Sequence, residues 1–437
     1  MSDIHMLEKI PVVQVKLEFV PSLAQLCETD GSERDILSQT ISLKMNELLA
    51  TLGIPGKTLI EMGASETTWM SGDQFFRTTV DGRRIQYPDE LLTWTYAYVT
   101  ESLANSATKL PDILEWLETI CQAGQEAPCY PLLVEFFSLT CREAIRSQPE
   151  MVLGLPQAEA YRALLPPAEE SELAKTVNWP PPAEWLLRVM KIVLNLGISL
   201  ADIPKVANKI RETMESSPED AAESLIAALR PDILEVHLPE EYLRTLTLDN
   251  PEKNVGMFPL LRDGLFDELG LVYPHFHFVI NEGLKPGGFA LKINNLLRLP
   301  QMGLQPDQCL VNDTQERLKL FSVEAIETRN PATQQPGSIA PIHDTEQLEG
   351  AGLTTWNIFG YLILCIAAEL RKNSWCLTDQ QMVQKSLEQL EMVFPALVSS
   401  VKAAYPLEQI TRLLRALISE ELSLRNLRLI LERLLDY

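Results

Sequence analysis

Two segments far apart in the chain share one pattern of apolar and polar positions. In each segment, four apolar residues follow the i, i+3, i+4, i+7 spacing that places their side chains on one face of a helix. The first set is Leu186, Val189, Met190 and Val193, and the second is Ile410, Leu413, Leu414 and Leu417. Ile410 lies 224 positions after Leu186, and Leu417 lies 224 positions after Val193. The pattern therefore predicts two amphipathic helices in the same register.

The same offset relates the residues that follow each helix. It pairs Ser199 with Ser423 and Asp202 with Asn426. A Ser side chain can accept a backbone N–H at the start of a helix. We therefore expect Ser199 and Ser423 to act as N-caps, with Asp202 and Asn426 three residues on. Each segment is predicted to form a helix, a short turn and a second, capped helix.

Further similarity lies upstream, where a predicted amphipathic helix ends at a glycine in each half of the chain. Gly53 and Gly270 are the predicted stops, because glycine is common just after the last turn of a helix. Short runs typical of strands follow each glycine and also open each half. They are residues 12–20, 57–62 and 74–80 in the first half, and residues 232–238, 275–280 and 289–294 in the second.

These patterns predict a helix-rich α+β fold with a tandem duplication of a multi-subdomain unit. Each unit combines small sheets with a helical bundle and a helix-turn-helix-like subdomain. The first copy is expected over 1–232 and the second over 233–437. The expected parts of the first are an α/β part at about 8–90, a helical part at about 91–150, a Pro-rich connector at about 151–181 and the capped helix pair at about 182–232. Those of the second are an α/β part at about 233–350, a helical part at about 351–405 and the capped helix pair at 406–437.

Composition and charge narrow the classes of function. The 437 residues are 46% hydrophobic and 22% charged, which is typical of a folded soluble protein. The formal net charge of −23 disfavours binding to phosphate backbones and to anionic lipids. The longest apolar run, Ile358 to Leu370, is shorter than the ~20 residues that a membrane span needs. We therefore expect no nucleic-acid partner, no direct membrane insertion, and a buried core helix over this run.

The cysteine pattern bears on the cellular compartment. The seven cysteines include no CxxC pair, and their number is odd. The first residues of the chain soon become charged and form no apolar secretory segment. These features predict free thiols and a cytoplasmic location.

No sequence motif of a common catalytic type is present. The chain has no GxSxG nucleophile elbow, no Walker A loop and no GxGxxG fingerprint. His275 and His277 lie on one face of a predicted strand, but a zinc site needs three or four ligands. The other histidines are His5, His237 and His343. We therefore expect no catalytic residues, no metal and no cofactor.

Three stretches of the second half occur in the order found in a known family. They are "LRDGLFDELGLVYPHFHFVINEGLKPGGFALKI" (261–293), "ETRNPATQQPGSIAPIHDTEQLEGAGLTTWNIFGYLILCIAAELRKN" (327–373) and "FPALVSSVKAAYPLEQITRLLRALISEELSLRNLRLILERLL" (394–435). On these stretches, the second half resembles the cytoplasmic region of the FHIPEP family, the export-gate proteins of flagellar and type III secretion systems. The first half resembles the family through its likeness to the second half and through "SSPEDAAESLIAALR" (216–230).

The resemblance implies a protein-docking role. In the family this region forms a ring that docks export chaperones with their cargo. The docking groove uses the Asp and Phe of an Asp-Pro-Ala-Phe motif and the Thr of a Gly-Tyr-Thr motif, and the matching positions here are Asn330, Thr333 and Thr354. The resemblance thus implies that these three residues bind a partner, with an amide in place of the carboxylate and no aromatic anchor. The family's membrane half has no counterpart in this sequence, so we expect that the chain is not itself an export gate.

The expected function is that of a non-enzymatic protein–protein interaction module, an adaptor or scaffold with two related surfaces. Its partners are expected to be proteins, and oligomer formation stays open. One alternative is a regulator within a type III secretion or flagellar export apparatus that binds a chaperone, a substrate or the gate. Another is a helix-turn-helix DNA-binding protein, because five arginines give the last helix pair some basic character. They are Arg412, Arg415, Arg425, Arg428 and Arg433.

Overall fold

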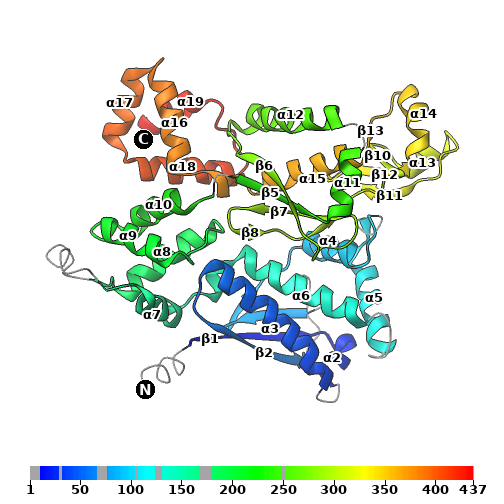
Figure 1. Cartoon of the computed structure of the whole chain (residues 1–437), viewed down its shortest axis with the longest axis horizontal. Coiled ribbons are helices and arrows are strands. Elements are labelled where there is room, and N and C mark those ends of the chain that lie inside the picture. Colours follow the sequence, from blue (N-terminus) through cyan, green and yellow to red (C-terminus); the bar gives the residue numbers. More distant parts are fainter. Residues whose placement is uncertain are drawn as a thin grey trace. The chain divides into compact units, whose positions relative to one another are not determined.

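The structure is a computed structural model, and it separates into two compact units (Figure 1). It describes residues 10–28, 32–65, 76–103, 107–123, 130–167, 179–231, 233–248 and 251–436. The first unit comprises Met1–Ala207 with Arg298–Met302, and the second comprises Asn208–Leu297 with Gly303–Tyr437. Residues 168–178 of the predicted Pro-rich connector lie outside the described residues.

A small sheet organises the first unit. Its strand order is β2-β1-β3-β4, with β1 parallel to β2 and antiparallel to β3. The strands are β1 (Val12–Phe19), β2 (Lys57–Ala64), β3 (Phe76–Val80) and β4 (Arg83–Ile85). Strand β1 forms because Val13, Val15, Leu17 and Phe19 alternate with polar residues, so that one face of the strand is fully buried. The strands predicted at 12–20 and 57–62 are confirmed, as is 76–80 of the strand predicted at 74–80, whose first two residues lie outside the described residues.

Helices cover this sheet and form the core of the first unit. Helix α3 packs against β2 and beside α6. Phe137 of α6 contacts Phe19 and Phe76 of the sheet, with ring centroids 5.1 and 4.9 Å away in edge-to-face geometry. The helices are α2 (Gln25–Glu28), α3 (Ser32–Leu52), α4 (Asp89–Val99), α5 (Leu110–Ala123), α6 (Tyr130–Ser147), α7 (Leu155–Leu164), α8 (Ala183–Asn195) and α9 (Ile203–Thr213), the last of which crosses the division between the units.

The second unit contains two small sheets. The first has the strand order β6-β5-β7-β8, with β5 parallel to β6 and antiparallel to β7. Its strands are β5 (Ile233–Leu238), β6 (His275–Ile280), β7 (Gly288–Ile293) and β8 (Leu296–Leu297). The other sheet has the order β11-β12-β10-β13. Its strands are β10 (Gln308–Val311), β11 (Ile326–Arg329), β12 (Pro336–Pro341) and β13 (Thr355–Trp356).

Helices make up the rest of the second unit. Helix α10 packs against α16 and α18, and α17 packs against both α16 and α19. The helices are α10 (Pro218–Leu229), α11 (Glu240–Leu248), α12 (Pro251–Leu269), α13 (Gln315–Lys319), α14 (Thr345–Gly350), α15 (Ile358–Lys372), α16 (Gln380–Glu391), α17 (Pro395–Ala404), α18 (Leu407–Ser419) and α19 (Leu427–Leu435). The predicted helix-rich α+β fold with small sheets is therefore confirmed.

The apolar run at Ile358–Leu370 is a core helix, as predicted. It lies in α15, where Leu362, Ile366 and Leu370 have no exposed surface. Asn357 caps this helix, since its side chain accepts the backbone N–H of Gly360 at 2.9 Å. No helix of the described residues is long and apolar enough to cross a membrane.

Each unit contains the same junction between a helix end and a turn. Gly53 and Gly270 have φ values of +73° and +74°, the left-handed region that favours glycine. A Cβ on Gly53 would lie under 3.0 Å from the backbone of Leu200, and a Cβ on Gly270 would do the same against Leu424. The backbone N–H of Leu200 donates to Leu52 O, and that of Leu424 donates to Leu269 O, each at 2.9 Å. Glycine is required at both stops for the backbone to approach this closely.

The prediction that Ser199 and Ser423 are N-caps is wrong. Their Oγ atoms accept backbone N–H groups two residues on, at 3.2 and 3.3 Å, and so brace the turn before the helix. The caps are Asp202 and Asn426, which directly precede α9 and α19. Each accepts the backbone N–H three residues on, at 3.1 and 3.3 Å. The serines lie too far before the first helical residue to reach those donors.

Candidate functional site

The sequence-predicted docking residues lie in the sheet of β10 to β13. Asn330 follows β11 and opens the turn to β12, and only 3% of it is exposed. Its Oδ1 accepts the backbone N–H groups of Ala332 and Thr333 at 2.8 and 3.2 Å. Its own N–H donates to Gln335 O at 2.9 Å. These bonds make Asn330 the residue that shapes the turn.

Asn312 connects two of the predicted residues. Its Oδ1 accepts the Nδ2–H of Asn330 at 2.7 Å, and its backbone N–H donates to Thr354 O at 3.1 Å. The Asn330 amide thus supplies the donor that Asn312 Oδ1 accepts. Asn312 was missed in the sequence, because nothing near it in the chain indicates its contact with a residue 18 positions later.

The three predicted residues therefore lie close together but differ in exposure. Thr333 and Thr354 are exposed, whereas Asn330 is buried. Thr333 Oγ1 also accepts the backbone N–H of Gln335 at 3.4 Å. A partner at this surface would meet two hydroxyl groups directly, while Asn330 would act by holding the turn in place.

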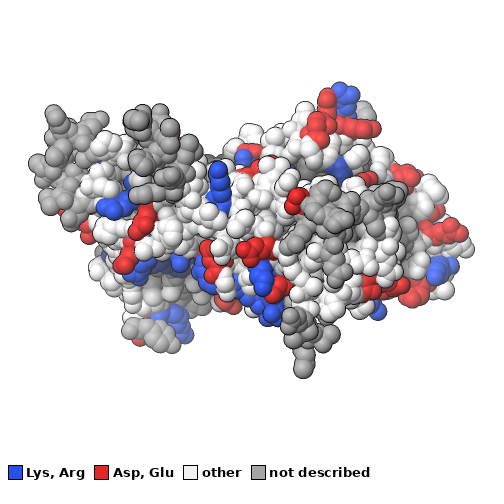
Figure 2. Space-filling model, turned by 90° about the horizontal axis from the view of Figure 1, so that it is seen from below, with Lys and Arg blue, Asp and Glu red and all other residues white. Residues whose placement is uncertain are grey.

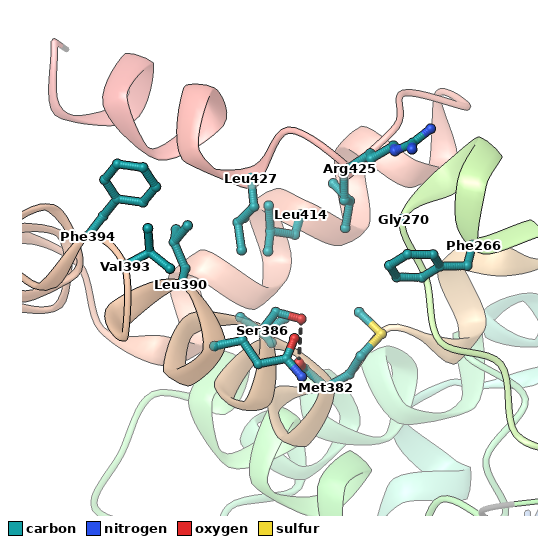
Figure 3. A pocket seen from close by; sticks show the side chains of 13 residues that line it. Phe266, Gly270, Met382, Ser386, Leu390, Val393, Phe394, Leu414, Arg425 and Leu427 are labelled. Carbon is teal, nitrogen blue, oxygen red and sulfur yellow. Dashed lines mark hydrogen bonds between the residues drawn. The ribbon is translucent and has the colours of Figure 1, made fainter. Parts of the chain in front are cut away.

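A second candidate site is a cavity of about 290 Å³ in the second unit, which we call the α16–α19 groove. Figure 3 shows Phe394 and Phe266 at opposite ends of it, with the side chains of Leu390, Leu414 and Leu427 between them. The apolar residues that line the groove are Phe266, Met382, Val383, Leu390, Val393, Phe394, Leu414, Leu424 and Leu427. Such a cavity can accept apolar side chains from a partner.

Exposed apolar side chains border this groove. Met392 and Val393, in the tight turn between α16 and α17, are 81% and 68% exposed. Apolar side chains that gather at a groove edge are typical of an interaction surface. The sequence signal for these side chains is the apolar stretch "MVFP" between two helical patterns.

Comparison with known proteins places this chain in a family. The sequence pattern of the FHIPEP family matches residues 176–437, which is more than half of the chain. The chain belongs to the FHIPEP family.

Its curated relatives are secretion, invasion and flagellar proteins. The low calcium response locus protein D of Yersinia pestis is 24% identical over 177 residues, which are 40% of this chain and 25% of that protein. The invasion protein InvA of Salmonella typhimurium is 29% identical over 178 residues, again 40% of this chain and 25% of that protein. The flagellar biosynthesis protein FlhA of Treponema pallidum is 26% identical over 177 residues, 39% of this chain and 24% of that protein. The chain thus spans about a quarter of the length of the curated relatives it matches.

Solved structures of similar proteins cover just under half of this chain. The CdsV protein of Chlamydia pneumoniae matches 46% of this chain and 59% of its own, with 25% sequence identity and a TM-score of 0.42. The C-terminal domain of InvA matches 46% of this chain and 58% of its own, with 24% identity and a TM-score of 0.38.

The arginines that suggested DNA binding are engaged with acidic side chains. Each of the five forms an ion pair, with N–O distances between 2.6 and 3.3 Å. The pairs are Arg412–Asp220, Arg415–Glu223, Arg425–Asp267, Arg428–Glu432 and Arg433–Asp436. On the face shown in Figure 2, blue Lys and Arg side chains and red Asp and Glu side chains are interspersed. A helix pair whose cations are already paired offers little attraction to a phosphate backbone, so the DNA-binding alternative is not favoured.

Two buried titratable side chains of α15 keep their protons at neutral pH. Tyr361 and Cys365 are almost fully buried within α15. Burial raises the pKa of the Cys365 thiol and of the Tyr361 hydroxyl above their usual values, so both stay protonated at neutral pH. Among the residues that the structure describes, no group of three His, Cys, Asp or Glu side chains could hold a metal ion. His275 instead faces Arg262, with 3.3 Å between its Nδ1 and Arg262 Nη1.

Proposed function

We propose that this chain is a non-enzymatic protein-docking module that works with a type III secretion or flagellar export apparatus. The observation that carries the proposal is the family match over residues 176–437. The names of the relatives support it, since they are proteins of secretion, invasion and flagellar biosynthesis. In this role the chain binds a component of the apparatus and regulates or organises it.

The docking surface in this proposal contains Thr333 and Thr354. They are the exposed members of the predicted cluster, and Asn330 and Asn312 hold the turn beneath them. The partner brings polar groups to this surface, because hydroxyl groups dominate it and no aromatic side chain stands at position 333. The expected partner is a protein, and the proposal places the chain in the cytoplasm. Free, buried thiols at Cys141, Cys309 and Cys365 suit such a reducing compartment.

The proposal also holds that the chain contains two divergent copies of one unit, over about 1–232 and 233–437. Three features support it. The sheet β2-β1-β3-β4 and the sheet β6-β5-β7-β8 have an equivalent strand order, with the same parallel and antiparallel pairs. Beside Gly53 and Gly270, the turns are held by equivalent hydrogen bonds, from Leu200 N–H to Leu52 O and from Leu424 N–H to Leu269 O. Asp202 and Asn426, which are 224 positions apart, cap the corresponding helices. Two copies would present two related surfaces on one chain.

The role in export can be tested in the native host. The gene is deleted, and exported proteins are measured in the medium and in whole cells. We expect the exported fraction to change while the total amount does not, and the full-length chain should restore the original level. Unchanged export in the deletion strain would contradict the proposal.

The docking surface has its own test. Thr333→Arg places a long cation on the exposed turn, whereas Asn330→Arg would break the turn itself, because Asn330 is buried. The matched control is Thr119→Arg, at an exposed position of α5. Thr333→Arg should fail to restore export in the deletion strain, and Thr119→Arg should restore it. If both variants restore export equally, the Thr333 surface is not the docking site.

A further inference from the structure

Helix α10 covers one face of the helix pair formed by α16 and α18. It carries three acidic residues and no Lys or Arg. Glu223 of α10 binds Arg415 of α18 with N–O distances of 2.6 and 2.9 Å, and Asp220 binds Arg412 at 3.1 Å. The Glu223 side chain has no exposed surface. This face of the second unit is therefore occupied by an acidic helix that neutralises two arginines.

A helix pair of the same order and spacing occurs in the first unit. The 3-10 helices Pro149–Val152 and Ser374–Leu377 lie 225 positions apart, as do the first residues of α7 and α16. Helices α8 and α18 lie 224 positions apart at both ends. Helix α8 packs against α7 and the first 3-10 helix, and α18 packs against α16 and the second one. The pair α7–α8 thus corresponds to the pair α16–α18.

Helix α8 carries cations at the positions that bind α10 in the second unit. The 224-position offset matches Arg188 with Arg412 and Lys191 with Arg415. Lys191 is half-buried, and no ion pair or hydrogen bond of its side chain occurs within the described part of the chain. A partly desolvated ammonium group gains from an anionic partner, because water no longer fully stabilises its charge. Lys191 therefore has the charge of Arg415 without the carboxylate that Arg415 binds.

The face around Lys191 is also more open than its counterpart. Leu155, the first residue of α7, is 41% exposed. Leu187 of α8 is half-buried, whereas Thr411, its counterpart by the same offset, has no exposed surface. Helix α10 cannot supply the missing carboxylate, because its Asp220 and Glu223 are bound to the arginines of α18. The acid that would pair with Lys191 must come from another molecule.

We propose that the face of α7 and α8 around Lys191 docks an acidic amphipathic helix of a protein partner, in the way that α10 docks on α16 and α18. The partner helix carries two carboxylates three positions apart, as Asp220 and Glu223 are, so that both lie on one side. One of them binds Lys191. Apolar side chains on the same side of the helix cover Leu155 and Leu187.

The inference rests on the correspondence between the two helix pairs, which is part of the proposed duplication, and not on a role in protein export. The proposed face belongs to the first unit, whereas the Thr333 surface belongs to the second. Its experiment measures binding by the isolated full chain. A negative result would therefore leave the export test and the Thr333 test unaffected.

The experiment uses the full chain and a fluorescein-labelled peptide with the sequence of residues 216–230. This peptide contains α10 and its N-cap Ser217, whose Oγ accepts the backbone N–H of Asp220 at 3.2 Å. A second peptide carries the change Glu223→Lys. Fluorescence anisotropy should show saturable binding of the first peptide and at least about tenfold weaker binding of the second. Equal affinities, or no binding of the first peptide, would overturn the proposal.

Variants of the chain place the binding at Lys191. Lys191→Glu should weaken binding of the first peptide about tenfold and should restore binding of the Glu223→Lys peptide, because the two charges are exchanged. Leu155→Glu, at the exposed edge of the face, should also weaken binding of the first peptide. The control is Lys205→Glu, the same charge change at an exposed position of α9.

Two results with these variants would overturn the proposal. One is a Lys191→Glu chain that is folded by circular dichroism and binds the first peptide like the parent. The other is a loss of binding that the Glu223→Lys peptide does not restore, since Lys191 would then act through the fold and not through a direct ion pair.

Sedimentation tests the competing occupant, which is a second copy of this chain. The parent and Lys191→Glu should show the same sedimentation coefficient, since the proposed occupant is a different protein. If the parent self-associates and Lys191→Glu sediments as a monomer, the face is an interface between copies and the proposal is wrong.

Discussion

Arg415 of α18 binds the carboxylate of Glu223 in α10 through two hydrogen bonds. The Nη1–Oε1 distance is 2.6 Å and the Nη2–Oε2 distance is 2.9 Å. The Glu223 side chain has no exposed surface, and the Arg415 side chain is 12% exposed. The guanidinium also donates to Thr378 O through Nε and Nη2. This pair fastens α10 to the last helices of the chain, although Glu223 lies 192 positions before Arg415.

Arg415→Met should lower the free energy of unfolding by about 3–5 kcal/mol, because it leaves the Glu223 carboxylate buried without its cation. Arg412→Met is the matched control. Arg412 and Asp220 join the same two helices but are 33% and 38% exposed, so the loss there should be about 1 kcal/mol or less. Urea denaturation of both variants measures the difference. Equal losses of unfolding free energy would show that burial of the Arg415–Glu223 pair does not increase its contribution to stability.

Gly270→Ala should destabilise the second unit by at least about 2 kcal/mol, since the residue has φ +74° and the new Cβ would press on the backbone of Leu424 and Arg425. Gly264→Ala, in the exposed interior of α12, should stabilise it by about 0.5–1 kcal/mol. Thermal unfolding of the two variants checks the opposite signs. If Gly270→Ala leaves the thermal stability unchanged, the turn before α19 can move away from the new Cβ.

The first unit should contain an acid-sensitive ion pair. Burial opposes the charged form of Glu143, but Arg146 and Arg142 outweigh it and hold the pKa of the carboxyl below its usual value of 4.5. Because the folded pKa lies below the unfolded one, the stabilisation is complete above about pH 4.5 and is lost as the pH falls through the folded pKa. Unfolding free energies of the parent and Glu143→Gln should therefore converge in acid. Parallel pH profiles for the two proteins would contradict this.

Leu431 should be the residue that anchors α19. It is fully buried, and Leu429 on the same helix is 46% exposed. Leu431→Ala should cost roughly 2–5 kcal/mol, as removal of buried side-chain volume does. Leu429→Ala should change stability by about 0.5 kcal/mol or less. The denaturation midpoints of the two variants measure this difference in stability. Similar midpoints would mean that α19 packs less firmly than the structure indicates.

Much of the fold could be predicted because it depends on local patterns. The alternation in Val12–Phe19 indicates a strand with one buried face, and the apolar run at Ile358–Leu370 indicates a core helix. Glycine after a helical pattern correctly indicated the helix ends at Gly53 and Gly270. These signals are readable because each depends on the spacing of neighbouring side chains and on the conformations that a single residue can adopt.

The candidate sites could be predicted less well. Asn330 was selected by resemblance as a contact residue, and the structure shows it buried in a turn that it builds with Asn312. The five arginines of the last helices looked like a basic surface, but their acidic partners include residues of α10 and α12. The helical spacing of an apolar residue shows which face it lies on, but not what packs against that face.

By itself, the sequence determined the strand at Val12–Phe19, the core helix over Ile358–Leu370 and the two glycines that end a helix, Gly53 and Gly270. The tertiary structure alone decided that Arg415 neutralises Glu223, that Asn330 is buried against Asn312, and that α12, α16, α18 and α19 leave an apolar groove between them. The physical reason is distance along the chain. Backbone conformation depends on adjacent residues, whereas charge pairing, burial and cavities depend on which distant segments the packing of the core brings together.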